Sequence, residues 1–341
     1  MQILQIKFKI QIRAKRIQNF IRPIAYLLIC LFAHLLICFF PSKASAQTIS
    51  VGVYPPIIQL QVNPPATVRS PITLQNLSDQ PLNMQILMQP FTASSDENGS
   101  ISLLEKKIVH TQIQDFLTTN VQLQNAQKQP IKEVLLTPRA VMTLYLFVTV
   151  PKDQKPNDYY FSVIFTTDAS DNPNANASSV GGGIATNVLV SIGPHQNPQG
   201  FINTFSAPGL VEHGPIPFSV KLTNQSNFFI QPQGFILITN MFGQTVGKVN
   251  LLPVNVLARS SRYIPDDNHE SLTQAVWPET FLIGPYSATL TIALSDKGPQ
   301  FERTIHFLAT PWQLCIGFIF AIFFGVIVWL KVKERLKKEN I

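Results

Sequence analysis

The sequence predicts an all-β fold of two tandem sandwiches followed by one apolar helix. Apolar and polar residues alternate along much of residues 47–310, and Pro and Gly interrupt this region at short intervals. A period of two is typical of half-buried antiparallel strands, and frequent prolines exclude long helices. The third observation is an uncharged stretch at residues 312–330, which is long enough for a helix across a bilayer.

The chain begins with the pattern of an export signal. A basic region without acidic residues (1–22) precedes a mostly apolar run (24–40), and Ala44 and Ala46 then form a small-x-small pattern. This order is typical of a signal peptide and its cleavage site. We therefore interpret residues 1–46 as a signal peptide, with an uncleaved anchor as the alternative. In both cases the middle of the chain is expected outside the membrane.

The apolar stretch near the end predicts a single membrane span. As a helix, residues 312–330 would be about 28 Å long at about 1.5 Å per residue, close to the hydrocarbon thickness of a bilayer. Basic residues stay on the cytoplasmic side, so residues 331–341 are expected to form a cytoplasmic tail. A buried core helix of a soluble protein is the alternative. The predicted interface anchors are Trp312, Trp329, Lys331, Lys333 and Arg335.

Charge and cysteine content exclude several kinds of protein. The net charge of +7 arises at the two ends, because residues 47–311 hold 14 basic and 17 acidic residues. We therefore expect no nucleic-acid partner. The three cysteines are Cys30, Cys38 and Cys315, so the predicted ectodomain has no disulfide and no zinc–thiolate site. The stability of such an ectodomain must come from its apolar cores. Eukaryotic cell-surface sandwiches more often contain a disulfide, so its absence favours a bacterial envelope protein.

Several segments show the strand pattern clearly. Residues 141–150 are apolar on both faces, as in a central strand, and a short helix is predicted near residues 115–121. The alternating segments are residues 58–63, 72–75, 84–88, 161–165, 218–223 and 288–294.

A linker is predicted at residues 193–200, where two prolines and two glycines fall within eight residues. It divides the ectodomain into an N-terminal sandwich at residues 47–195 and a C-terminal sandwich at residues 200–310. The Asn- and Ser-rich residues 170–183 are expected to form a long hairpin loop within the first sandwich.

The two halves repeat one plan. An alternating strand runs into Asn76-x-Ser78 in the first half and into Asn224-x-Ser226 in the second. Asn and Ser side chains can bond the backbone two residues on, so each motif predicts a closed turn.

A second repeat involves tyrosines. Tyr159 and Tyr286 each follow a turn and precede an alternating strand, similar to the tyrosine corner of immunoglobulin-like sandwiches. Both repeats occur in the same order, which favours two immunoglobulin-like domains.

The order of parts resembles that of the WxL-interacting proteins of Gram-positive cell surfaces. Local similarity lies at residues 53–64, 181–190 and 277–294. The resemblance implies a signal peptide, two β-sandwiches, a C-terminal membrane helix and a basic tail. It also implies peptidoglycan binding by the first domain and host-protein binding by the second, without a motif that assigns either to named residues. Proline-flanked first strands also occur in periplasmic pilus chaperones and other immunoglobulin-like modules.

Acidic loops are the candidates for metal binding. Residues 266–270 combine two Asp, one Asn, one His and one Glu, and residues 96–100 have a faint likeness to a calcium loop. The second loop lacks the EF-hand spacing. Asp168 and Asp171 are further acids in the Asn-rich loop. Solvated loops are the simpler interpretation throughout, so we expect no metal and no cofactor.

No pattern for catalysis stands out. The chain lacks Gly-x-Ser-x-Gly, and each histidine of the predicted ectodomain stands alone in sequence. Asp153 and Asp158 flank one turn, but Lys152 and Lys155 beside them favour surface charges over a glycosidase pair. We therefore expect that the protein is not an enzyme.

Four large apolar residues form the predicted interaction surface. Phe228 and Phe229 follow the turn at Asn224, and Met241 and Phe242 lie at a predicted hairpin tip. Exposed aromatic residues favour contact with a partner or stacking on a sugar. The alternative is that they plug the end of the sandwich.

These observations predict a membrane-anchored envelope protein that recognises peptidoglycan or other surface proteins without catalysis. A membrane-tethered chaperone or assembly factor that acts by β-strand addition is the alternative, and it requires an exposed strand edge. A cell-wall hydrolase would require convergent carboxylates, for example Asp266 or Glu270.

A protease site inserted at position 250 tests the predicted topology. We expect cleavage by protease added to intact cells, because residues 47–311 are predicted to lie outside. The same site protected in intact cells and cleaved only after lysis would contradict the export of this region.

Overall fold

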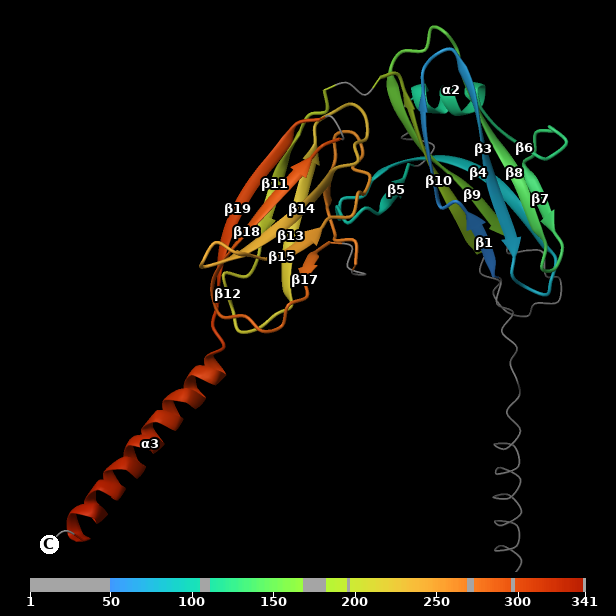
Figure 1. Cartoon of the computed structure of the whole chain (residues 1–341). Coiled ribbons are helices and arrows are strands. Elements are labelled where there is room, and N and C mark those ends of the chain that lie inside the picture. The colour runs from blue at the N-terminus through green and yellow to red at the C-terminus, as the bar shows by residue number, and fades with distance from the viewer. Residues whose placement is uncertain are drawn as a thin grey trace, which may run out of the picture. The chain divides into compact units, whose positions relative to one another are not determined.

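The computed structural model describes residues 50–104, 111–167, 182–194, 197–268, 273–295 and 298–339 (Figure 1). The predicted signal peptide at residues 1–46 lies outside them, as does most of the predicted loop at residues 170–183.

The first sandwich has one purely antiparallel sheet. Its strands follow the order β1-β3-β8-β6. They are β1 (Val51–Tyr54), β3 (Ala66–Asn76), β8 (Val141–Val150) and β6 (Val121–Gln124).

The second sheet of this sandwich is mixed. Its order is β2-β10-β9-β4, and β5 and β7 both pair with the outer side of β4. Only the β2–β10 pair is parallel. The strands are β2 (Ile57–Val62), β10 (Gly183–Ile192), β9 (Asn157–Thr167), β4 (Leu82–Ala93), β5 (Ile101–Leu103) and β7 (Glu133–Leu136).

Alternation in the sequence explains the first core. On β3 the side chains of Ile72 and Leu74 are fully buried, and on β8 those of Leu144 and Leu146 are. Period-two burial directs these residues into the space between the two sheets. The predicted helix is α2 (Thr111–Asn120), which lies at one end of this sandwich (Figure 1). The predicted central strand is β8, between β3 and β6.

The second sandwich repeats the arrangement. One sheet has the order β11-β13-β16, with β17 also on β13, and the other has the order β12-β19-β18-β14-β15. The first holds β11 (Gly200–Ser206), β13 (Ile216–Asn224), β16 (Ser261–Tyr263) and β17 (Ala275–Trp277). The second holds β12 (Leu210–Val211), β19 (Gln300–Ala309), β18 (Gly284–Ala293), β14 (Gln233–Asn240) and β15 (Thr245–Asn250).

The strand order confirms the all-β, immunoglobulin-like prediction. In each sandwich the chain begins with two strands, one in each sheet: β1 and β2 in the first sandwich, β11 and β12 in the second. The second strand of each pair, β2 or β12, pairs in parallel with the last strand of its sandwich, β10 or β19. The orders β2-β10-β9-β4 and β12-β19-β18-β14 are therefore equivalent. They match the sheet of immunoglobulin domains that contains the last two strands.

The two asparagine motifs make the same hydrogen bonds. Asn76 Nδ2 donates to the carbonyl oxygens of Gln80 at 2.7 Å and Thr137 at 3.0 Å, and Asn76 Oδ1 accepts from Ser78 N at 2.9 Å. Asn224 Nδ2 donates to Phe228 O at 2.8 Å and Leu257 O at 3.0 Å.

Both asparagines are almost completely buried, and each amide also reaches a third carbonyl oxygen, that of Leu136 or Val256. Ser226 N donates to Asn224 Oδ1 at 2.8 Å, as Ser78 N does to Asn76. The predicted turns are therefore confirmed, and each amide also holds a distant loop of its own sandwich.

The tyrosine repeat is present with one difference. Tyr286 OH accepts from the backbone N–H of Ile283 at 3.3 Å, as in a tyrosine corner. Tyr159 OH instead accepts from the side chain of Gln154 at 2.9 Å, and its ring stacks on Phe116 at 3.9 Å between centroids. The first sandwich thus replaces the backbone bond by a side-chain bond and an aromatic contact.

The apolar stretch near the end forms α3 (Trp312–Glu339). Within the part of the chain that the structure describes, no helix is both long enough and apolar enough to cross a membrane. The span predicted at residues 312–330 is therefore not supported.

Replacing Asn76 by alanine should destabilise the first sandwich by about 3 kcal/mol, because three carbonyl oxygens lose a donor and the bond to one of them, Leu136 O, is buried. Asn125→Ala is the matched control, since Asn125 Oδ1 also accepts from backbone N–H groups, those of Gln127 and Gln129, but its hydrogen bonds lie at the surface. Its cost should stay below about 1 kcal/mol. Urea denaturation followed by circular dichroism measures both, and equal losses would contradict the role of the buried amide.

Candidate functional site

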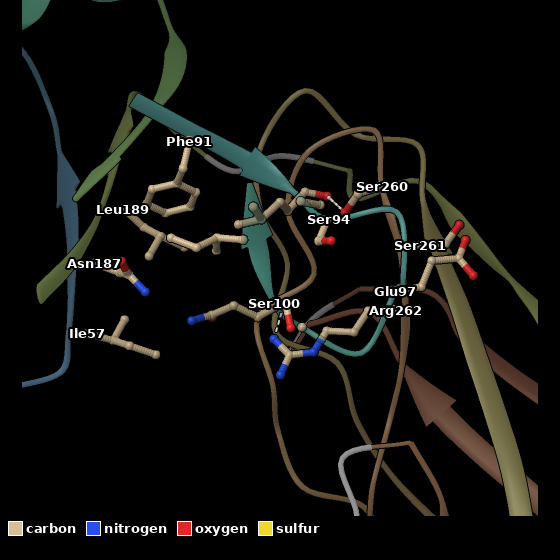
Figure 2. A pocket seen from close by; sticks show the side chains of 15 residues that line it. Ile57, Phe91, Ser94, Glu97, Ser100, Asn187, Leu189, Ser260, Ser261 and Arg262 are labelled. Carbon is tan, nitrogen blue, oxygen red and sulfur yellow. Dashed lines mark hydrogen bonds between the residues drawn. The ribbon is translucent and has the colours of Figure 1, made fainter. Parts of the chain in front are cut away.

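An apolar cluster joins the two sandwiches. Phe91 of β4 and Leu189 of β10 pack with Phe229, which lies in the loop between β13 and β14. All three are buried, and the ring of Phe91 stacks on Tyr160 at 6.0 Å between centroids. Figure 2 shows Phe91 and Leu189 side by side. The cluster uses the outer face of the β2-β10-β9-β4 sheet, so this face is partly covered by the second sandwich.

A half-buried carboxylate, that of Asp158, lies next to this cluster. Asp158 Oδ2 accepts from Tyr160 OH at 2.6 Å and from Phe229 N at 2.7 Å, and Asp158 Oδ1 accepts from Ser191 OH. Tyr160 OH in turn accepts from Ala258 N at 3.3 Å. The prediction of Asp158 as a surface charge is therefore wrong, because it bonds the backbone of the second sandwich.

Burial and the neighbouring charge of Asp158 keep the phenol of Tyr160 neutral. Burial raises the pKa of Tyr160 far above its usual value, and the negative charge of Asp158 acts in the same direction. Tyr160 is therefore protonated and donates its hydroxyl hydrogen to Asp158. The result is a fixed polar link between β9 and the second sandwich.

The loop at residues 96–100 also contacts the second sandwich. Glu97 forms an ion pair with Lys221 of β13, and its carbonyl oxygen accepts from Tyr263 N of β16 at 2.9 Å. Gly99 has a φ of 96°, and a Cβ there would lie 2.3 Å from the Arg262 guanidinium. This loop, predicted as a polar turn with a faint calcium-loop likeness, is a docking contact.

A small cavity of about 60 Å³ lies beneath this loop (Figure 2). Arg262 reaches into its lining and donates to Asn255 O at 2.8 Å, while burial lowers the pKa of its guanidinium. The Nε of Arg262 and the Oδ1 of Asn255 have no hydrogen-bond partner among the described residues. The cavity has room for a few water molecules but not for an organic ligand.

Among the described strands, β2 is an edge of its sheet, and it lies near the junction. Asn187 N donates to Pro56 O and Gly193 N to Val62 O, both at 2.9 Å, so the even-numbered residues of this segment bond β10. The backbone groups of Ile57, Gln59 and Gln61 therefore point away from β10. No further strand pairs with β2 in the described part of the chain.

This edge borders a hollow of about 380 Å³. The hollow combines amide side chains with apolar ones from the second sandwich. Its main lining residues are Gln59, Gln61, Phe228, Phe229, Gln231 and Gln233.

Several of the other described edges are less suited to pair with a new strand. β11 and β14–β15 contain register shifts, and β15 carries Lys248. Bulges and edge lysines are the usual protection against pairing. β5 and β12 have only three and two residues, and the Leu123 carbonyl of β6 is already bonded by Ile131 N. β2 has six residues in unbroken register and no charge.

The predicted interaction residues do not form one surface. Phe229 is buried in the junction, and Phe228 is half-buried, packs on the second core and lines the hollow. Met241 and Phe242 lie at the β14–β15 tip, where they are 54% and 77% exposed.

The predicted membrane anchors lie on α3. Trp312, Trp329, Lys331 and Lys333 are exposed, and Lys333 Nζ lies 5.1 Å from the Trp329 ring. The side chain of Arg335 is not among those that the structure describes.

The predicted metal ligands have other partners or lie outside the described residues. Asp266 is buried and accepts from Asn268 N at 2.8 Å and Val276 N at 2.6 Å, so it closes a turn. His269 and Glu270 lie outside the description, as do Asp168 and Asp171. Among the described residues no group of three His, Cys, Asp or Glu is placed to hold a metal ion.

Sequence reasoning missed Asp158, Tyr160 and the edge of β2. One signal was present for Asp158, which is an acid at the second position of a strand that is otherwise mainly apolar and aromatic. No signal was present for the edge, since periodicity does not reveal which strands are neighbours.

Comparisons with known proteins give similarity to solved structures only. No protein-family model and no curated protein matches the chain. The class 5 fimbriae chaperone CfaA aligns with a TM-score of 0.36 and 12% identity, over 77% of this chain and 100% of its own. The chaperone DraB of E. coli gives 0.31 and 12%, over 75% and 98%. The CupB2 chaperone of Pseudomonas aeruginosa gives 0.32 and 7%, over 74% and 98%. At these TM-scores the likeness does not bear on function, and the resemblance to WxL-interacting proteins stays a prediction.

Replacing Tyr160 by phenylalanine should loosen the junction, because Ala258 N loses its acceptor and Asp158 loses a donor, at a cost of about 1–2 kcal/mol. We expect faster hydrogen exchange at the amides of Ala258 and Phe229. Tyr145→Phe is the matched control, since Tyr145 lies on β8 with its ring against Arg69. Unchanged exchange at both amides in Tyr160→Phe would show that this network does not hold the sandwiches together.

Proposed function

We propose that this chain is a non-catalytic recognition protein that binds an extended segment of another exported protein by adding it as a strand to β2. The observation that supports the proposal is the edge of β2, which no described strand pairs and which borders the hollow beside the junction. Among the two functions that the sequence favours, this is the assembly factor or chaperone.

The edge offers main-chain bonds that do not depend on the sequence of the partner. Ile57, Gln59 and Gln61 each present an N–H and a C=O to an incoming strand. Recognition of particular segments would come from the hollow, where Phe228 offers an apolar surface and the exposed side chains of Gln59 and Gln61 offer amides. Such a site fits a partner strand with alternating apolar and polar residues.

The location of this activity is part of the proposal. The export signal predicted at residues 1–46 would place the two sandwiches outside the cytoplasm, where unassembled surface proteins expose free strands. Membrane attachment through residues 312–330 is not needed for strand addition, because β2 lies in the first sandwich.

Recognition of a cell-wall polymer is the second candidate function. Phe228 lines the hollow together with several glutamine side chains, and an aromatic ring with neighbouring amides can stack on and bond a sugar. Binding of a polymer would use the side chains of the hollow rather than the backbone edge of β2. One experiment that changes only the backbone edge therefore distinguishes the two candidate functions.

The test replaces Gln59 by proline. Proline removes the outward N–H of Gln59 but none of the bonds to β10, and residue 58 can remain extended before it. We expect the full-length variant to lose the retention of surface-protein extracts that the parent shows. Gln59→Ala, which keeps the N–H and removes the side chain, should retain them.

Two controls accompany this experiment. Protection of the Leu189 and Ser191 amides against hydrogen exchange reports that β2 and β10 remain paired in the variant. Equal retention of surface proteins by Gln59→Pro and the parent would count against strand addition. Retention of purified sacculi by both would favour the cell-wall polymer instead.

A further inference from the structure

A group of exposed apolar side chains lies at one end of the second sandwich. We call it the end patch, and it comprises Leu210, Met241, Phe242, Phe281, Ile283 and Leu308. Single exposed apolar residues are common on protein surfaces, but six large ones at one end of a domain are not. Each is at least 43% exposed, so the second core does not account for them.

Strand register brings these residues to the same end. Leu210 of β12 is the partner of Leu308 in β19, and Gly284 at the start of β18 is the partner of Ala309. A Cβ on Gly284 would lie 2.6 Å from the terminal carbon of Met241, so the β14–β15 tip crosses the start of β18.

The loop residues complete the group. Phe281 and Ile283 directly precede Gly284, and the N–H of Ile283 is fixed by Tyr286 OH. Phe242 stands next to Met241, and its N–H donates to Asn240 Oδ1 at 3.0 Å. The side chains therefore project from short, internally bonded loop tips.

The apolar helix begins at the same end. Thr310 N donates to Val211 O and Trp312 N to Thr310 O, both at 2.8 Å, so the start of α3 is bonded next to β12. The described side chains of residues 316–330 are exposed around the whole helix. A helix that is apolar on every face is suited to lipid rather than to one protein surface.

We propose that the end patch rests on a lipid bilayer, with the loop tips in the headgroup region and the apolar faces of α3 continuing the same lipid contact. Contact of this kind does not require a helix to cross the bilayer. Aromatic residues such as Phe242 and Phe281 on projecting tips suit the boundary between headgroups and acyl chains. The end patch itself contains no basic residue, so its contact does not require anionic lipid.

The test measures the depth of the loop tips in vesicles. The full chain, with its three cysteines replaced by alanine, carries one new cysteine at Phe242→Cys, labelled with an environment-sensitive dye. It is reconstituted into phosphatidylcholine vesicles that contain a nitroxide lipid with its label near the headgroup. Phe281→Cys on a separate loop is the second reporter. Gln225→Cys in the exposed β13–β14 loop, at the opposite end of the sandwich, is the control.

We expect nitroxide quenching at both reporters to exceed quenching at the control by at least about twofold, because a bilayer-seated tip lies within roughly 5–10 Å of the acyl boundary. A folded reporter that is quenched no more than Gln225→Cys overturns the proposal. A change of dye fluorescence with protein concentration in the absence of vesicles would show that a second copy covers the patch, which also overturns it. Circular dichroism of each labelled variant identifies those that fold.

Discussion

Each sandwich is closed by one buried side-chain amide. Asn76 and Asn224 end equivalent strands, and each donates to carbonyl oxygens of its own turn and of a loop that arrives from much later in the sequence. The bonds to the carbonyl oxygens of Leu136 and Val256 are buried, where a lost donor is costly. Because residues 47–311 contain no cysteine, these amides take over the task of joining distant segments that a disulfide performs in many secreted domains.

The structure extends the repeat beyond the asparagines. Arg139 and Arg259 both have a positive φ, near 59° and 56°, and the N–H of each donates to the serine of the asparagine motif. A positive φ in a residue other than glycine costs free energy, so its presence in both halves points to the same loop geometry. The shared geometry includes the parallel pairing of β2 with β10 and of β12 with β19. The two sandwiches thus share one topology, and they differ mainly in the length of the parallel pairing, which is longer for β2 with β10 than for β12 with β19.

Sequence patterns predicted what is local and missed what is distant. Alternation predicted the strands, and the Asn-x-Ser spacing predicted the turns, because both depend on neighbours within a few residues. Asp158 was predicted on the surface because Lys152 and Lys155 precede it, yet its partner Phe229 lies 71 residues away. The role of residues 96–100 was likewise set by residues of the second sandwich. The free edge of β2 follows from strand order, which periodicity does not contain.

The parallel pairing of β2 with β10 determines how the edge behaves under load. A partner strand pulled along its own axis transmits that force along β2, so that every backbone bond of the six-residue register is sheared together. Peeling from one end would break the same bonds one by one. β10 is in turn linked through Ser191 to the half-buried Asp158. If a partner strand adds to β2 as proposed, a pull along the strand axis would meet more resistance than a pull that peels the strand from one end.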